Sequence, residues 1–190
     1  MQYFFRTLFS VALLVVISSA LLPNRYTIAK TITSHCQPPQ FEKWVLDISN
    51  WHLWVPFSTY QKTWQTLELA NSNKIGAYLK WQSGENIGEM TVTAITKQSM
   101  SYSSVIEQHT NIGHIKAEPF AKHLQISWSI EGGINTPIIG SIVTLYYKYK
   151  TQDAINLGLR NLNSLCKSQR MDKQNANQAN NRATTFSANN

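Results

Sequence analysis

The sequence predicts an α+β domain in which an antiparallel sheet is covered by one long carboxy-terminal helix. Between residues 75 and 131 apolar side chains recur at every second position, which is typical of strands with one buried face. Near the carboxy terminus they recur at every third or fourth position, as on one face of a helix, through Ile155, Leu159, Leu162 and Cys166. A third feature, a hydrophobic segment at the amino terminus, lies outside this domain.

The segment 1–24 is predicted to be a transmembrane anchor or a signal peptide. Its uninterrupted apolar run begins near Leu8, after the single charge of Arg6, and is shorter than the ~20 residues that a spanning helix prefers. If Met1–Ala20 is a cleaved signal peptide, the protein is exported and soluble. If it stays, it forms a single-pass membrane helix whose orientation is open, because Arg6 is balanced by Arg25 and Lys30.

The domain proper, residues 25–168, begins with a predicted strand at Tyr26–Thr33. Pro38 and Pro39 end this strand, and Pro39 suits the start of a helix. One face of that short helix is formed by Phe41, Trp44, Val45 and Ile48. The stretch NWHLWVPF then predicts a second, very short helical element that Pro56 closes.

Alternation in the middle of the chain predicts several consecutive strands. Their apolar faces are Ile75, Ala77, Leu79 and Trp81; Met90, Val92 and Ala94; Met100, Tyr102, Ser104 and Ile106; and Leu124, Ile126, Trp128 and Ile130. Turns are predicted at Asn71–Asn73, Ser83–Asn86, Thr110–Gly113 and Gly132–Gly133. Short connections of this kind favour an antiparallel meander, so the expected order is strand, two short helices, about six strands and a final helix.

The final helix is the only element long enough to cover the apolar face of the sheet. A helical period begins in the aromatic segment Pro137–Lys150 and continues through Thr151–Lys167. Gly158 lies within the apolar stripe, where glycine costs about 1 kcal/mol relative to alanine. Such a glycine usually indicates either a close backbone approach or room left for another group. The Asn- and Gln-rich tail, residues 169–190, is predicted to be disordered, because it has too little apolar surface to offset its chain entropy.

Composition excludes several classes of function. The net charge is +7, but the basic residues are scattered singly, so no nucleic-acid partner is expected. His109 and His114 are expected to flank the turn at Thr110–Gly113, without a third ligand at metal spacing. No catalytic motif, cofactor site, metal site or general acid–base pair is identifiable in the sequence. No residue is therefore assigned a catalytic role. Cys36 and Cys166 form either a disulfide or two separate buried thiols, and the second interpretation is preferred.

Four segments in order resemble the START-like superfamily, in particular its polyketide cyclase/dehydrase-like branch of small bacterial proteins. They are ISNWHLWVPF, KIGAYLKWQSGENIGEMTVTAI, LQISWSIEGG and NLGLRNLNSL. The resemblance implies a helix-grip fold, with a curved sheet wrapped around the carboxy-terminal helix and an apolar cavity between them. It supplies no catalytic set. Relatives of this kind often carry a hydrophobic helix close to the first strand, which favours an uncleaved anchor here.

The fold that the resemblance implies makes the apolar face a candidate cavity wall. The candidate ligand-cavity residues are Trp51, Trp54, Trp81, Met90, Tyr102, Trp128, Gly158 and Leu159. The expected function is a membrane-tethered binding or carrier protein for a hydrophobic small molecule, with a lipid as the expected cargo. The alternatives are a polyketide cyclase/dehydrase-like enzyme and a membrane-anchored interaction module. A protein partner is unknown.

Overall fold

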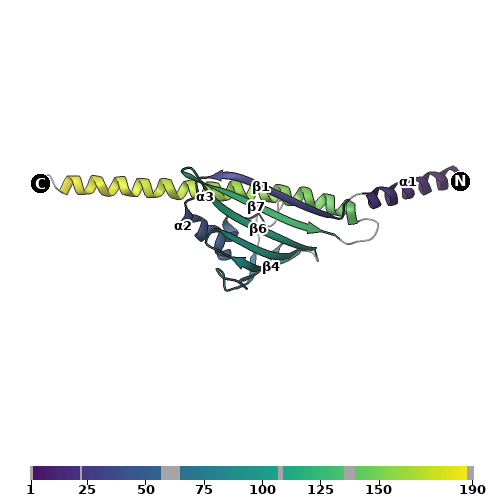
Figure 1. The fold of residues 1–190 in the computed structure, drawn as a ribbon, viewed down its shortest axis with the longest axis horizontal. Coiled ribbons are helices and arrows are strands. Elements are labelled where there is room, and N and C mark those ends of the chain that lie inside the picture. Colours follow the sequence, from purple (N-terminus) through teal and green to yellow (C-terminus); the bar gives the residue numbers. More distant parts are fainter. Residues whose placement is uncertain (1, 22, 57–64, 107–108, 135–139, 188–190) are drawn as a thin grey trace.

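The protein is an antiparallel sheet with one long helix lying along it (Figure 1). The structure, a computed structural model, describes residues 2–21, 23–56, 65–106, 109–134 and 140–187. The seven strands lie in the order β1-β7-β6-β5-β4-β3-β2. Their bounds are β1 Arg25–Ser34, β2 Gln65–Ala70, β3 Tyr78–Ser83, β4 Asn86–Ile95, β5 Ser99–Ile106, β6 His109–Phe120 and β7 His123–Gly133. The predicted α+β class, with a sheet and a long carboxy-terminal helix, is confirmed.

The predicted apolar faces are buried along most strands. The buried side chains include Leu79 and Trp81 of β3, Met100 and Tyr102 of β5, and Leu124, Ile126 and Trp128 of β7. In β4 the register shifts between Val92 and Ala94, which is a β-bulge. Val92 is buried but Ala94 is exposed, so the alternation predicted for β4 ends at the bulge.

Two of the predicted turns lie inside strands. Gly132 and Gly133 belong to β7 and pair with β1, so no turn lies there. The other turn, with the histidines beside it, lies inside β6. Residues 110–113 belong to β6, so the prediction of a turn at Thr110–Gly113 is wrong. Gly113 is needed there for packing, because the ring of Tyr102 lies directly over it. His109 and His114 therefore lie on one strand and do not face each other across a hairpin. The ring of His109 contacts Tyr147, and Nδ1 of His114 hydrogen-bonds Ser101 Oγ at 2.8 Å.

Three short helical elements connect β1 to the rest of the sheet: α2 (Pro38–Phe41), the π-helical η1 (Glu42–Leu46) and the 3₁₀-helical η2 (Ile48–Leu53). The backbone N–H of Gln37 donates to Gln40 Oε1 at the start of α2. The carboxylate of Asp47 accepts from the backbone N–H of Ser49 at the start of η2, as an N-cap does. The predicted short helical element at NWHLWVPF is thus present as η2, which ends at Leu53, and Phe57 lies outside the described residues.

Helix α3 (Gly140–Ser187) covers the sheet near β1 with the predicted stripe. Ile155, Leu159, Leu162 and Cys166 are all buried. Pro137 lies outside the described residues. The helix continues past residue 169 to Ser187 (Figure 1). No glycine or proline interrupts residues 159–187, and each residue added to an existing helix gains a backbone hydrogen bond.

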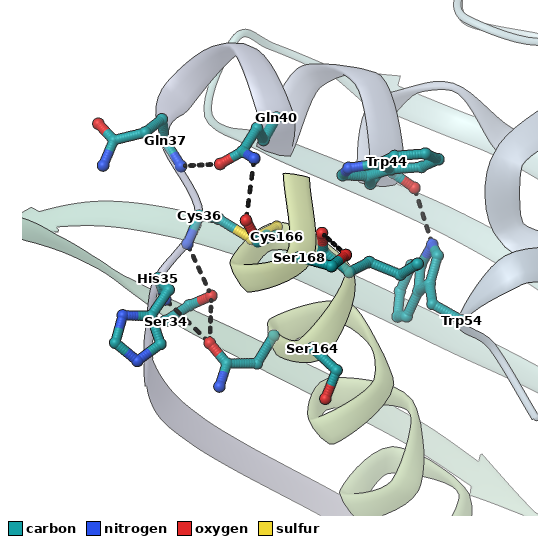
Figure 2. The surroundings of a disulfide bond; sticks show 12 residues. Ser34, His35, Cys36, Gln37, Gln40, Trp44, Trp54, Ser164, Cys166 and Ser168 are labelled. Atoms are coloured by element: carbon teal, nitrogen blue, oxygen red, sulfur yellow. Dashed lines mark hydrogen bonds between the residues drawn. A yellow bond between two sulfur atoms is a disulfide. The ribbon is translucent and has the colours of Figure 1, made fainter. Parts of the chain in front are cut away.

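A disulfide joins the end of β1 to α3 (Figure 2). The bond links Cys36 to Cys166 across 130 residues of sequence, and both cysteines are buried. Beside it, Gln40 Nε2 donates to the backbone carbonyl of Cys166 at 3.1 Å. The preferred prediction of two separate thiols is therefore wrong. Spacing in sequence could not reveal the pair, because only the packing of α3 against β1 brings the two cysteines together.

The amino-terminal helix α1 (Gln2–Leu21) extends from one end of the domain, opposite to the carboxy-terminal part of α3 (Figure 1). The carbonyl of Asn24, just after α1, accepts from the backbone N–H of Ile134 and from Thr144 Oγ1 in the first turns of α3. Within the ranges that the structure describes, no helix is long and apolar enough to cross a membrane. The predicted single-pass helix is therefore not confirmed.

Candidate functional site

A cavity of about 250 Å³ lies between the apolar face of the sheet, η2 and the first turns of α3. Its residues come from strands β3 to β7, from η2, from Val55 and Pro56 after η2, and from α3. The described residues that line it are Trp51, Val55, Pro56, Trp81, Ser83, Asn86, Ile87, Gly88, Met90, Tyr102, Ser104, Ile106, Asn111, Trp128, Ile130, Tyr146, Tyr147, Lys150, Thr151 and Ala154.

The inner end of the cavity is formed by buried aromatic rings. The ring centroid of Trp51 lies 5.2 Å from that of Tyr102 and 6.4 Å from that of Trp128, both edge-on. The indole N–H of Trp128 donates to the Tyr102 hydroxyl at 3.0 Å. Trp51 is itself fixed, because its indole N–H donates to the backbone carbonyl of Val45 at 2.9 Å. The walls are therefore held by hydrogen bonds as well as by packing.

Two glycines leave room for the rings of the wall. A Cβ atom built on Gly88 would lie 2.2 Å from Cζ2 of Trp81, and one built on Gly113 would lie 2.0 Å from Cζ of Tyr102. Each ring thus lies flat on the backbone of a neighbouring strand, where any side chain would force it away. Because the rings lie against the sheet, space remains above them.

Hydroxyl groups supply the polarity of the inner cavity. Ser83, Tyr102 and Ser104 are buried and line the cavity. Burial raises the pKa of the Tyr102 phenol above its ordinary value, although the hydrogen bond from Trp128 opposes this shift. Tyr102 consequently stays protonated and neutral through the physiological range.

The outer end of the cavity is more polar and reaches the surface. The Tyr26 hydroxyl donates to Asn111 Oδ1 at 2.9 Å and also lies 3.2 Å from Thr151 Oγ1, which connects β1, β6 and α3. Asn86, Ile87 and Tyr146 are exposed, so they form the rim. Lys150 also lines the rim, with its ammonium group 5.4 Å from the ring centroid of Tyr146.

The structure brings five of the eight candidate residues to the cavity: Trp51, Trp81, Met90, Tyr102 and Trp128. The other three lie in the core beside it. Trp54 packs on Trp128 with ring centroids 5.4 Å apart, and its indole N–H donates to the Trp44 carbonyl. A Cβ atom on Gly158 would lie 2.8 Å from Cζ3 of Trp128, which is the close approach that this glycine indicated. Leu159 is fully buried under α3.

Sequence reasoning missed the polar residues of the cavity. Ser83 and Ser104 each follow a wall residue, Trp81 or Tyr102, by two positions, so the period of a strand already placed them on the same face. That signal was present in the sequence. No comparable signal pointed to Lys150 or Thr151, because their position depends on how α3 lies over the sheet.

Comparisons with known proteins give matches in structure and none in sequence. No family model matches the chain, and no curated protein matches it. The KanY protein matches with a TM-score of 0.57 at 11% identity, covering 76% of this chain and 99% of its own. Protein CV1439 from Chromobacterium violaceum matches with a TM-score of 0.54 at 14% identity, covering 76% and 98%. Ara h 8.0201 matches with a TM-score of 0.53 at 15% identity, covering 76% and 99%.

At such identities the comparisons show the fold alone. The neighbours are consistent with the START-like fold that the sequence motifs resemble. No matching family model confirms the polyketide cyclase/dehydrase-like branch. In this chain the sheet and the long carboxy-terminal helix enclose a cavity.

Proposed function

We propose that this protein binds a hydrophobic small molecule in the cavity between the sheet and α3. The observation that carries the proposal is the space itself, about 250 Å³ bounded by the rings of Trp51, Trp81 and Trp128. Ligand pockets in proteins typically measure roughly 300–1,000 Å³ and are mostly apolar with a few polar groups. The cavity volume is just below that range, which favours a compact molecule, or one end of an acyl chain, over a whole two-chain lipid.

Sequestration is the mechanism that these walls support. An apolar guest gains about 25 cal/mol for each Å² of surface that it removes from water. The buried aromatic wall supplies that environment, while the exposed rim at Ile87 and Tyr146 supplies an entrance. The protein would then hold a molecule that is poorly soluble in water and release it elsewhere.

The chemistry of the lining favours binding over catalysis. Among the described lining residues there is no aspartate, glutamate or histidine, and Lys150 at the rim is the one charged side chain. Tyr102 is a poor general base, since burial raises its pKa. A cyclase or dehydrase would need its side chains to position a substrate without a strong acid or base at the inner end.

We also propose that the α1 end of the domain associates with a membrane. Exposed apolar side chains recur on the first turns of α3 at Ile142, Leu145, Tyr146 and Tyr149. Their spacing of three, one and three residues forms one face of the helix. Tyr146 belongs to this face and to the rim of the cavity. A lipid surface on this face would therefore lie beside the entrance.

Helix α1 supports the same orientation. It joins the domain through Asn24, which bonds to Thr144 in the first turns of α3, and it exposes Phe4, Phe9 and Leu14 among other apolar residues. Flotation with liposomes of phosphatidylcholine and phosphatidylglycerol tests the association. We expect the full chain to float and Leu145→Glu/Tyr149→Glu to float less. Gln152→Glu, an exposed change on the same helix, is the matched control, and equal flotation of all three proteins would contradict the role of this face.

The disulfide supports a location in an oxidising compartment. Structural disulfides persist in exported proteins and are rare where thiols are kept reduced. Joined to a hydrophobic amino-terminal segment, the Cys36–Cys166 bond favours export of the domain, with α1 as its signal or anchor. Alkylation of intact cells followed by mass spectrometry tests this proposal. We expect unmodified, bonded cysteines, and two alkylated thiols in the native protein would refute the exported location.

The binding proposal is tested by the molecules that purify with the full chain. We expect native mass spectrometry of the protein, extracted in an amphipathic polymer without detergent, to detect a bound small molecule. Ala154→Phe adds a ring at the cavity wall and should abolish this species, whereas Gln152→Phe on the exposed side of α3 should retain it. The same bound species in both variants would show that it does not occupy the cavity.

A further inference from the structure

Three buried hydroxyl groups line the inner cavity, and one of them has no hydrogen-bond partner in the described part of the chain. Ser83, Tyr102 and Ser104 line the cavity with exposed fractions of 5%, 4% and 7%. The hydroxyl of Ser83 has no hydrogen-bond partner among the described residues. Buried polar groups are nearly always paired, so an unpaired hydroxyl on a cavity wall suggests that its partner is a ligand.

Tyr102 is the most informative of the three, because its unused capacity is known. Its oxygen already accepts the indole N–H of Trp128 at 3.0 Å. Its own hydrogen finds no acceptor among the described residues, so the phenol is available as a donor. Burial keeps the group protonated. The hydroxyl is also fixed in place, since its ring lies over Gly113 and meets Trp51 edge-on.

Ser104 extends this donor site along the same face of β5. It lies two residues from Tyr102 and directly opposite Asn111 on β6. Asn111 is in turn held by the Tyr26 hydroxyl. The two hydroxyls of β5 therefore lie between the aromatic inner end and the polar rim, where one molecule can meet both environments.

The charge of the cavity limits what this site can accept. Lys150 is the one charged side chain among the described lining residues, and it lies at the rim near Tyr146. A carboxylate at the inner end would be buried without a cation, which is strongly unfavourable. A carbonyl, ether or similar neutral oxygen meets no such penalty.

We propose that the cavity recognises a compact, uncharged, ring-containing hydrophobic molecule through a neutral acceptor oxygen, which accepts a hydrogen bond from Tyr102 with support from Ser104. This inference rests on the proposed binding function and names the chemical class of the ligand. The indole rings of Trp51, Trp81 and Trp128 contact the apolar body of the ligand. The hydroxyls of β5 select the oxygen.

Three probes of equal size distinguish the contribution of the hydrogen-bond donor to the affinity from that of the apolar wall. 2-Acetylnaphthalene carries a carbonyl oxygen, 2-isopropenylnaphthalene replaces that oxygen with a CH₂ group, and 2-naphthoate carries a charged carboxylate. Quenching of tryptophan fluorescence in the full-length protein measures each affinity. One net hydrogen bond corresponds to about a fivefold to tenfold preference for the ketone over the alkene. The naphthoate should bind most weakly.

Substitutions then assign the preference to a residue. Tyr102→Phe should bring the ketone and the alkene to nearly equal affinity while the alkene binds as before, and Ser104→Ala should lower the preference partially. The controls are Tyr78→Phe and Ser103→Ala, which lie on the opposite face of the sheet. Thermal unfolding of each variant identifies any that fails to fold. Ser104→Ala removes none of the core hydrogen bonds described above, so it keeps the test decisive if Tyr102→Phe is unstable.

The outcomes separate this inference from the proposed function. Equal binding of ketone and alkene by the wild-type protein would overturn the inference and leave a purely apolar binding site. The same would follow from a ketone preference that survives in both Tyr102→Phe and Ser104→Ala. Failure of both neutral probes to bind at all would instead count against the binding function itself.

Discussion

Removal of the Cys36–Cys166 disulfide should destabilise the domain by several kcal/mol. The bond closes a loop across 130 residues. In the chain-entropy treatment, closing a loop of this length lowers the entropy of the unfolded chain and so stabilises the folded state by ~5 kcal/mol at 25 °C. Measured stabilisation by disulfides is typically ~2–4 kcal/mol. Both sulfurs are buried beside α3, so the bond also joins the covering helix to the first strand.

Urea unfolding of the full chain measures this contribution. With a slope of about 2 kcal/mol per molar urea, a loss of ~4 kcal/mol lowers the midpoint by about 2 M. We expect that shift when the wild-type protein is reduced, and also in Cys36→Ala/Cys166→Ala without reductant. The double variant should no longer respond to reductant, which controls for direct effects of the reducing agent.

One result would refute the reasoning. Mass spectrometry under non-reducing conditions first establishes that the bond is present in the wild-type protein. If the oxidised and reduced proteins then unfold at the same urea concentration, closure of the long loop contributes nothing, and the unfolded chain must already hold its two ends together. The bond would then hold α3 in position against β1 without adding to the free energy of unfolding.

Three further predictions concern the cavity. Gly88→Ala should force the Trp81 ring toward the cavity, destabilise the protein by about 1–3 kcal/mol in thermal unfolding and weaken binding of 2-acetylnaphthalene. Trp128→Ala should cost about 3–5 kcal/mol in urea unfolding, because Trp128 packs on two other tryptophans and over Gly158. Raising the pH above the ordinary tyrosine pKa of about 10 should lower the free energy of unfolding, since the unfolded chain ionises first while burial raises the pKa of Tyr102 in the fold. Tyr102→Phe should show a shallower decline with pH.

Each of these predictions has a clear contrary result. Unchanged stability and probe binding in Gly88→Ala would show that the Trp81 ring is not held against the β4 backbone. A cost below about 1 kcal/mol for Trp128→Ala would indicate a wall residue that the core does not need. An identical pH dependence in wild type and Tyr102→Phe would show that this phenol does not couple to folding.

The sequence by itself determined the class of the fold and the identity of the buried faces. Alternation in β3, β5 and β7 and the stripe through Ile155 and Leu159 follow from the periods of strand and helix, which are local properties. The aromatic wall was predictable for the same reason. The turn predicted at Thr110–Gly113 was wrong, because Gly113 makes room for the ring of Tyr102 on the neighbouring strand and does not form a turn.

Only the tertiary structure decided what these faces enclose. Three features join segments that are far apart in the chain. They are the bond between Cys36 and Cys166, the contact of Gly158 with Trp128, and the position of Lys150 at the rim. The cavity likewise depends on how closely α3 approaches the sheet, which is set by the sum of many side-chain volumes. A periodic pattern states which way a side chain faces. It does not state how much space remains between two faces once they meet.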